Sequence, residues 1–231
     1  MKTFTVAFPL SVSADAVPEF LREKFGWDVS REKFIVPGSP VFFTPTVQPR
    51  VPDLEKIFEE HFALSEEESK ALAAHGSLFF LQFAVRSYEE FSSFLKVAET
   101  LLKDGALGIY IENSGCAWSP KMFLELISGD VPLEAFLNFV ETSDSLFTLG
   151  MEPFGAPDLC VLNATEKFDP RTALVFAADS IVRDGADFST GKRLKDDAGN
   201  EFEFHSEAKS PFPKGTSEWN ARGYVRLVGR K

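Results

Sequence analysis

The sequence has few of the residues that most often carry out chemistry. Its 231 residues include two cysteines, three histidines and three tyrosines. Two cysteines are too few for a disulfide framework, so a reducing compartment such as the cytoplasm fits. The chain has no glycine-rich phosphate loop, compact zinc signature or serine nucleophile elbow. We therefore expect no cofactor and no bound metal.

Positive charge is also scarce, because the formal net charge is −11. A surface this acidic repels phosphate backbones and anionic lipid, so we expect neither nucleic acid nor a membrane as partner. No apolar run approaches the length that spans a bilayer. Residues 205–231 are an exception to the charge balance, with six basic residues against two acidic ones. We expect this basic segment to lie on the acidic body of the chain, and the alternative is a docking site for an acidic partner.

Phenylalanine, in contrast, is abundant, with 25 residues. Its ring has no polar group, so most of these side chains should lie in a core. The length suits one α+β domain over residues 1–231. In this prediction residues 1–76 add a strand and helices to the body, residues 77–205 form the core, and residues 206–231 form the basic C-terminal segment.

The clearest unit lies between residues 77 and 112. SLFFLQFAV (77–85) is a continuous apolar strand, Ser87 to Glu90 is a helix capping box, and an amphipathic helix continues to Gly105. ALGIYIE (106–112) is a second apolar strand. Strand, helix and strand in this order predict a parallel βαβ unit whose two strands pair in the middle of a mixed sheet.

Weaker patterns predict the remaining elements. The alternation of residues 3–10 indicates a first strand better than a signal peptide. Prolines restrict the 37–52 stretch to an edge strand or a loop. The other predicted elements are helices ending at Gly26 and Gly76, helices starting at Asp53, Ser65, Pro120 and Asp169, a helix from Pro132 to about 141, strands 145–151 and 158–163, a C-terminal hairpin at 193–205, and a last edge strand at 224–229.

Four stretches resemble a bacterial protein family known as domain of unknown function 4261. They are residues 78–103, GALGIYIENSGCAWSPKMF at 105–123, SLFTLGMEPFGAPDLCVLN at 145–163, and DGADFSTG at 184–191. Together they cover roughly residues 78–205. The resemblance implies a mixed α/β fold. It implies no catalytic residues, because the family has no established activity.

The stretch GIYIENSGCAWSP (108–120) offers the one candidate nucleophile, Cys116. A thiol in a loop after a strand, near a helix N-terminus, can be reactive. A cysteine nucleophile needs a base, however, and the histidines of this chain carry no catalytic signature. We favour a structural Cys116 in the bend between a buried strand and a helix. Weak ligand-binding candidates are Glu112, Asn113, Ser114, Trp118 and Glu152.

The histidines permit a metal interpretation that we do not favour. His61 and His75 have glutamates nearby, at positions 59, 60 and 66–68. Their spacing matches no zinc signature. His61 lies beside the apolar stripe of its predicted helix, so a partly buried, hydrogen-bonded histidine is the preferred interpretation.

No motif specifies a reaction, so three functions stay open. The first is a non-catalytic bacterial cytoplasmic domain that binds a basic protein, as an immunity or adaptor protein does. The second is a small-molecule-binding domain or enzyme with its site at the loops 112–119 and 152–158. The third is self-association through a face rich in phenylalanine. The charge of −11 favours the first.

Overall fold

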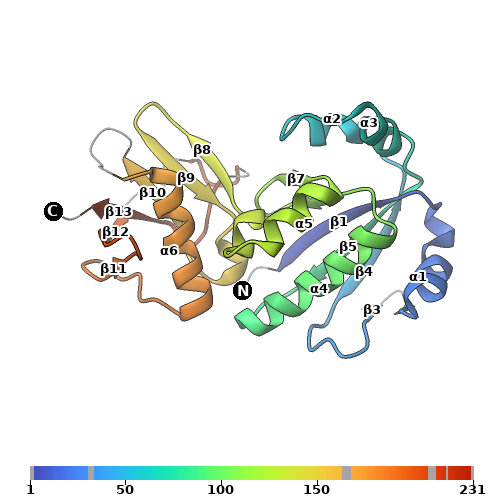
Figure 1. The fold of residues 1–231 in the computed structure, drawn as a ribbon, viewed down its shortest axis with the longest axis horizontal. Coiled ribbons are helices and arrows are strands. Elements are labelled where there is room, and N and C mark those ends of the chain that lie inside the picture. The colour runs from blue at the N-terminus through green and yellow to red at the C-terminus, as the bar shows by residue number, and fades with distance from the viewer. Residues whose placement is uncertain (1–2, 31–33, 163–167, 208–211, 217, 230–231) are drawn as a thin grey trace. The chain divides into compact units, whose positions relative to one another are not determined.

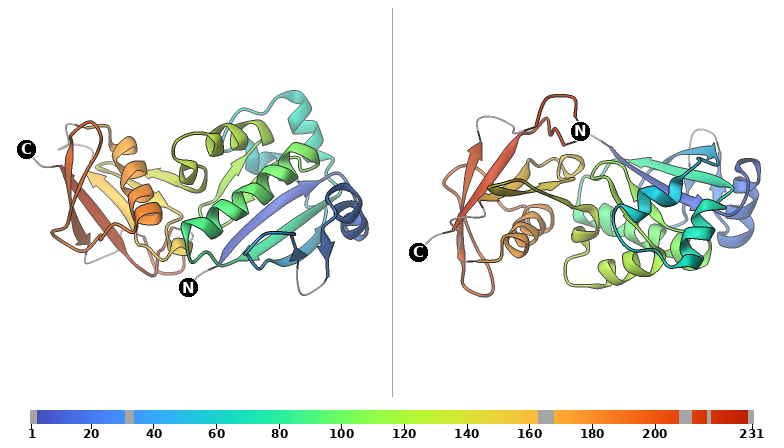
Figure 2. Two further views of the ribbon diagram at one scale, coloured as in Figure 1. Left: turned by 60° about the horizontal axis from the view of Figure 1, so that its bottom comes forward. Right: turned by 90° about the horizontal axis from the view of Figure 1, so that it is seen from above.

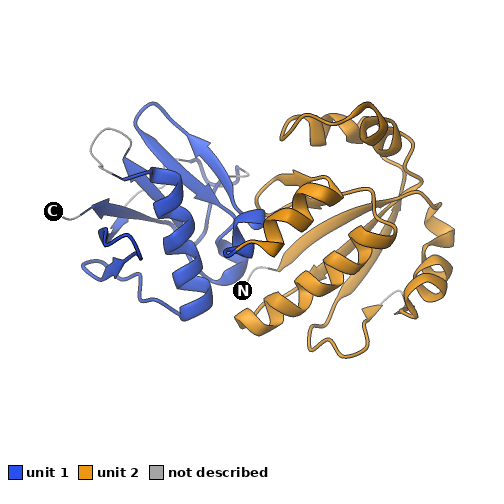
Figure 3. Cartoon of the chain, viewed as in Figure 1, with its two compact units in different colours: residues 1–2, 130–231 blue, residues 3–129 orange. Residues whose placement is uncertain are grey.

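A computed structural model describes residues 3–30, 34–162, 168–207, 212–216 and 218–229. The sequence predicts one domain, whereas the chain divides into two compact units, residues 3–129 and residues 130–231 (Figure 3). We call these the N-terminal unit and the C-terminal unit. Each unit has a sheet of its own, because no strand of the first 129 residues pairs with a described strand of the later ones. The predicted α+β class with mixed sheets is confirmed.

The sheet of the N-terminal unit has five strands in the order β4-β5-β1-β6-β7 (Figure 1). Their bounds are Thr44–Pro49, Ser77–Phe83, Phe4–Leu10, Ile109–Ile111 and Cys116–Trp118. The predicted βαβ strands are β5 and β6, and they run in the same direction because both are antiparallel to β1. The prediction that they pair with each other is wrong, since β1 lies between them. Their crossover, α4 (Tyr88–Asp104), has 17 residues and is long enough to pass over a strand.

The phenylalanines concentrate on one face of this sheet. Phe4 and Phe8 pair in register with Phe83 and Phe79, so all four rings point to the same side. The helix α4 covers this side, and its Phe94 stacks on Phe83 with ring centroids 4.2 Å apart. Figure 2 shows α5 (Pro120–Ser128) along the same face as α4. Among the described residues the exposed large apolar side chains are Ile35 and Phe42, and most of the phenylalanines are buried in cores, as predicted.

Two short helices, α2 (Leu54–Glu59) and α3 (Glu66–Ala73), lie on the opposite face. Leu54, Phe58 and Leu72 of these helices pack against Leu78 and Ala117 of the sheet. The predicted capping box of α3 is present: the Glu68 backbone donates to Ser65 Oγ, and the Glu68 carboxylate accepts from the Ser65 backbone. The first helix of the chain, α1 (Val17–Phe25), ends at Gly26, where φ is +68°.

The proline-rich stretch forms an edge strand, as predicted. Pro45 and Pro49 lie in β4, which pairs with β5 on one side. A proline has no N–H, so it is accepted in a strand only where its nitrogen faces away from the neighbour. Two short strands, β2 (Asp28–Val29) and β3 (Phe34–Ile35), pair with each other before it. The outer edge of β4 therefore offers few donors to another strand.

The C-terminal unit has a six-stranded sheet in the order β11-β12-β13-β10-β9-β8. The strands are Arg193–Lys195, Glu201–Glu207, Tyr224–Gly229, Asp158–Leu162, Ser145–Leu149 and Asn138–Glu141. The predicted hairpin is confirmed as β11 and β12. The predicted edge strand β13 instead lies inside the sheet, antiparallel to β12 and parallel to β10. Its Val225 and Leu227 are buried, which an edge position would not require.

A long helix, α6 (Pro170–Asp184), packs on this sheet through Ala173, Leu174, Ala177 and Ala178. Asp169 caps it by accepting from the Thr172 backbone, as predicted, and Gly185 closes it. The helix expected from Pro132 to about 141 is shorter. It is a 3₁₀ helix over Pro132–Phe136, because the chain then becomes extended to pair as β8 with β9.

Candidate functional site

The stretch that carries Cys116 is a β-hairpin. Residues 112–115 form a tight turn between β6 and β7, in which the Gly115 N–H donates to the Ile111 carbonyl at 2.8 Å. Gly115 has a φ of +73°, which favours glycine at this position. Cys116 therefore belongs to a strand and not to the predicted bend. The helix that follows, α5, is capped by Ser119, whose Oγ accepts from the Met122 backbone.

Cys116 is packed inside the N-terminal unit, with 2 % of its surface exposed. It pairs with Ile111, and Ile111 pairs with Val6, so its side chain points to the face that is lined with phenylalanine. A nucleophile has to reach its substrate, which a thiol buried under α4 and α5 cannot do. Cys160 lies in β10, and burial raises the pKa of its thiol to about 12. Both thiols act as small core side chains.

The other candidates in the hairpin have different surroundings. Asn113 holds the end of β1, because its Oδ1 accepts from the Thr5 backbone at 2.8 Å and its Nδ2 donates to the Thr3 carbonyl at 3.1 Å. This amide is occupied by the fold. Ser114 is buried, and Trp118 is half-buried at the end of β7. Glu112 differs from these residues because its carboxyl has a raised pKa.

Glu112 lies beside Tyr110 and the end of α2. The Glu112 side chain is exposed, and partial desolvation by the surrounding protein still raises the pKa of its carboxyl. Burial also raises the pKa of Tyr110, and the carboxylates of Glu112 and Glu60 raise it further. Burial lowers the pKa of His61, whose ring has a hydrogen bond with the Gly115 backbone. These side chains lie where α2 meets the β6–β7 turn. The group contains two carboxylates, Glu60 and Glu112, with Tyr110 and a single basic residue, His61.

The helices next to this group are strongly acidic. Residues 53–68 contain seven carboxylates and a single lysine, Lys56. Lys56 pairs with Asp53 at 2.8 Å, and Lys70 of α3 pairs with Glu66. Glu59, Glu60 and Glu67 are exposed. We call the carboxylates of residues 53–68, together with Glu112, the acidic α2–α3 surface.

His75 has a structural role. Its Nε2 accepts from the Val51 backbone at 3.1 Å, so its Nδ1 carries the proton and donates to the Leu72 carbonyl at 2.6 Å. With both ring nitrogens engaged, His75 has no lone pair left for a metal. Within the described ranges no group of three histidine, cysteine or carboxylate side chains is arranged to hold a metal ion.

Glu152, the last candidate, belongs to the C-terminal unit, so the two loops predicted to share a site lie in different units. It stands in a 3₁₀ helix, Glu152–Phe154, next to a residue that the sequence did not single out, Asp158. Asp158 is 3 % exposed. Burial raises its pKa to about 7, and the neighbouring Glu152 adds to the increase.

Asp158 joins three segments of the C-terminal unit. Its Oδ2 accepts from Asn220 Nδ2 at 2.7 Å, and its Oδ1 accepts from the Met151 backbone at 3.1 Å. Thr148 Oγ1 lies 3.5 Å from the same Oδ1 and accepts from the Leu159 N–H. These hydrogen bonds connect Thr148 of β9, Met151 and Asn220 through one buried carboxyl. The sequence could have indicated Asp158, because it is a charged residue at the start of an apolar strand. It contained no local indication of Asn220, which lies 62 positions away.

The basic C-terminal segment lies on its own unit. Arg226 pairs with Glu207 of the neighbouring strand at 3.1 Å, and the Lys214 ammonium lies 5.7 Å from the centre of the Trp219 ring. Both contacts join residues of the segment itself, whereas its strand β13 pairs with β10 and β12 inside the sheet of the C-terminal unit. Lys209, Arg230 and Lys231 fall outside the described residues.

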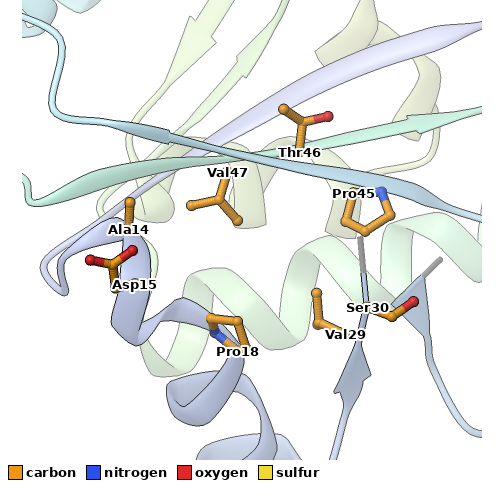
Figure 4. Close-up of a pocket in the computed structure, with 8 residues that line it drawn as sticks. All are labelled: Ala14, Asp15, Pro18, Val29, Ser30, Pro45, Thr46 and Val47. Carbon is orange, nitrogen blue, oxygen red and sulfur yellow. The ribbon is translucent and has the colours of Figure 1, made fainter. Parts of the chain in front are cut away.

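A cavity of about 760 Å³ adjoins β4 in the N-terminal unit. Figure 4 shows Val47 pointing from β4 toward α1, with Pro18 on the helix and Val29 on β2. Asp15 is the only ionisable residue in the described lining, and Ser30 and Thr46 add hydroxyl groups.

Comparisons with protein-family models, curated proteins and solved structures found no match to this chain. The resemblance of residues 78–205 to domain of unknown function 4261 therefore stays a prediction. No helix in the described part of the chain combines the length and the apolar character needed to cross a membrane.

Proposed function

We propose that this protein is a non-catalytic binding domain of the bacterial cytoplasm, similar in role to an immunity or adaptor protein, which recognises a basic protein. The single observation that supports the proposal best is the acidic α2–α3 surface. Seven carboxylates fall within 16 residues there, next to Glu112, whose exposed side chain has a raised carboxyl pKa. The charged side chains project from two helices that are anchored to the sheet by Phe58 and Leu72.

The electrostatics of this surface favour a cationic partner. The raised pKa values of Glu112 and Tyr110 show that burial and neighbouring acids disfavour negative charge there. A lysine or arginine side chain placed near Glu112 would stabilise its charged form. Complementary charge of this kind mainly increases the association rate and the selectivity for basic partners, and it makes binding sensitive to salt.

The test uses the full chain as bait in a lysate of bacterial cells. The variant Glu59→Gln/Glu60→Gln/Glu67→Gln removes three exposed charges and leaves the Ser65–Glu68 cap and the Lys70–Glu66 pair in place. We expect the wild-type chain to retain basic proteins that mass spectrometry identifies, and the triple variant to retain much less of them. Retention should also decrease as salt increases from about 0.05 to about 0.5 M.

A matched control separates this surface from net charge alone. The variant Glu19→Gln/Glu23→Gln/Glu89→Gln also removes three exposed charges, from α1 and the start of α4. It should retain the same basic proteins as the wild type. Equal losses in the two variants, retained proteins without basic character, or retention that does not respond to salt would each refute the proposal.

A further inference from the structure

A second cavity, of about 340 Å³, lies within the C-terminal unit between α6 and the 3₁₀ helix Pro132–Phe136. The helix α6 contributes Thr172, Val175, Phe176 and Asp179, which recur at the spacing of one helix face. Val131 and Glu134 line it from the other side. The cavity therefore has an apolar wall, with acidic groups from both elements.

Asp179 is the unusual member of this lining. The residue is 9 % exposed, and its Oδ2 pairs with Arg183 Nε at 3.2 Å. Arg183 also donates from Nη2 to the Asp130 carbonyl at 2.8 Å. The other oxygen, Oδ1, is buried and accepts no hydrogen bond from any described residue. A buried acceptor without a donor is unfavourable, so a donor from outside the chain would be bound at this oxygen.

The cation already present in the lining is engaged elsewhere. Arg171 directs Nε and Nη2 to Glu134 Oε1, at 3.3 and 3.0 Å. Its guanidinium also stands over the Phe139 ring, 4.3 Å from the centre. The lining thus holds two carboxylates and one arginine, Arg171. The edge of its guanidinium contacts Glu134, and one face lies over Phe139. Glu134 is therefore paired with Arg171 and Asp179 with Arg183, and the acceptor of the lining that is left without a donor among the described residues is Asp179 Oδ1.

We propose that this cavity binds a small organic monocation, a primary ammonium on an aliphatic or aromatic body. The ammonium donates to Asp179 Oδ1, and the body lies against Val131, Val175 and Phe176. A guanidinium ligand fits less well, because it prefers both oxygens of a carboxylate and Arg183 already holds Oδ2. An anion would meet two carboxylates. The volume is near the lower end for ligand pockets, about 300 Å³, which suits an amine of amino-acid size.

Calorimetric titration of the full chain with 2-phenylethylamine tests this proposal, with 2-phenylethanol as the neutral ligand of the same shape. A charge-assisted hydrogen bond to a buried carboxylate predicts that the amine binds at least about tenfold more tightly than the alcohol. Asp179→Asn should remove this preference. Asp184→Asn, at an exposed position on the same helix, should keep it.

Two further results decide the outcome. Val175→Phe fills the cavity without altering a charged group, so it should abolish binding of both ligands even if Asp179→Asn fails to fold. Equal affinity for amine and alcohol in the wild type would overturn the proposal. So would a folded Asp179→Asn variant that keeps the preference, or the absence of amine binding up to about 1 mM. None of these results depends on the acidic α2–α3 surface, which lies in the other unit.

Discussion

The buried Asp158 carboxyl predicts an unusual dependence of stability on pH. Its pKa in the folded chain is about 7, above the usual 3.8, so the folded state binds its proton more tightly than the unfolded state does. The resulting stabilisation is complete below about pH 4, and it is lost as pH rises through about 7. The folded protein should therefore become less stable between mildly acidic and mildly alkaline pH, the reverse of the behaviour of an ion-paired aspartate.

The size of the effect follows from the two pKa values. A shift of about three units corresponds to about 4 kcal/mol over the whole pH range. Between about pH 5 and about pH 8 the same linkage relation predicts a loss of about 2 to 3 kcal/mol in the free energy of unfolding. Asp158→Asn cannot titrate, so this part of the pH dependence should disappear. Its amide oxygen can still accept from the Met151 N–H.

Urea unfolding at both pH values, followed by circular dichroism, measures this difference. The wild type and the variant share all their other titrating groups, so comparing their pH dependence isolates Asp158. Asp187→Asn serves as the control, because Asp187 is exposed and its pKa of about 2 lies below the range tested. Identical pH dependence in the wild type and in Asp158→Asn would refute the assigned role of this carboxyl.

Three further predictions concern the N-terminal unit and both thiols. Phe94→Ala should cost about 3–5 kcal/mol in unfolding free energy, because the ring is fully buried, whereas Phe42→Ala at an 88 % exposed ring should change it by less than about 0.5 kcal/mol. Cys116 and Cys160 should resist alkylation by iodoacetamide until denaturant unfolds the chain, and rapid labelling of the native protein would contradict their burial. Ser65→Ala should lower the free energy of unfolding by about 1 kcal/mol through loss of the α3 cap, and an unchanged urea midpoint would argue against that cap.

Much of the local structure follows directly from the sequence. Ser65, Ser87 and Asp169 each cap a helix where the pattern predicts it, and the Ser87 Oγ accepts from the Glu90 backbone. The Glu90 carboxylate, however, accepts from the Arg86 N–H and not from Ser87. Caps and apolar periodicity involve residues three or four positions apart, so a single sequence contains most of what decides them.

The candidate site was harder to infer, because its character depends on distant segments. Glu112 was among the predicted ligand residues, but its neighbour Tyr110 is also close to Glu60 of α2, which depends on how α2 packs on the sheet. Asn113 has the residue type of a ligand-binding side chain and instead holds Thr5, 108 positions away. The residue types of Glu112 and Asn113 both suggested ligand binding. Long-range packing determined that Asn113 instead forms hydrogen bonds within the fold.

The sequence by itself determined most of the helices and strands, where many of them begin and end, and that most phenylalanines are buried. Only the tertiary structure decided that β1 separates β5 from β6, that β13 lies inside its sheet, and that Asp179 keeps a buried oxygen without a donor. The reason is physical. Helix caps and periodicity are short-range interactions, whereas strand order and the environment of a buried carboxylate depend on which surfaces meet across many tens of residues.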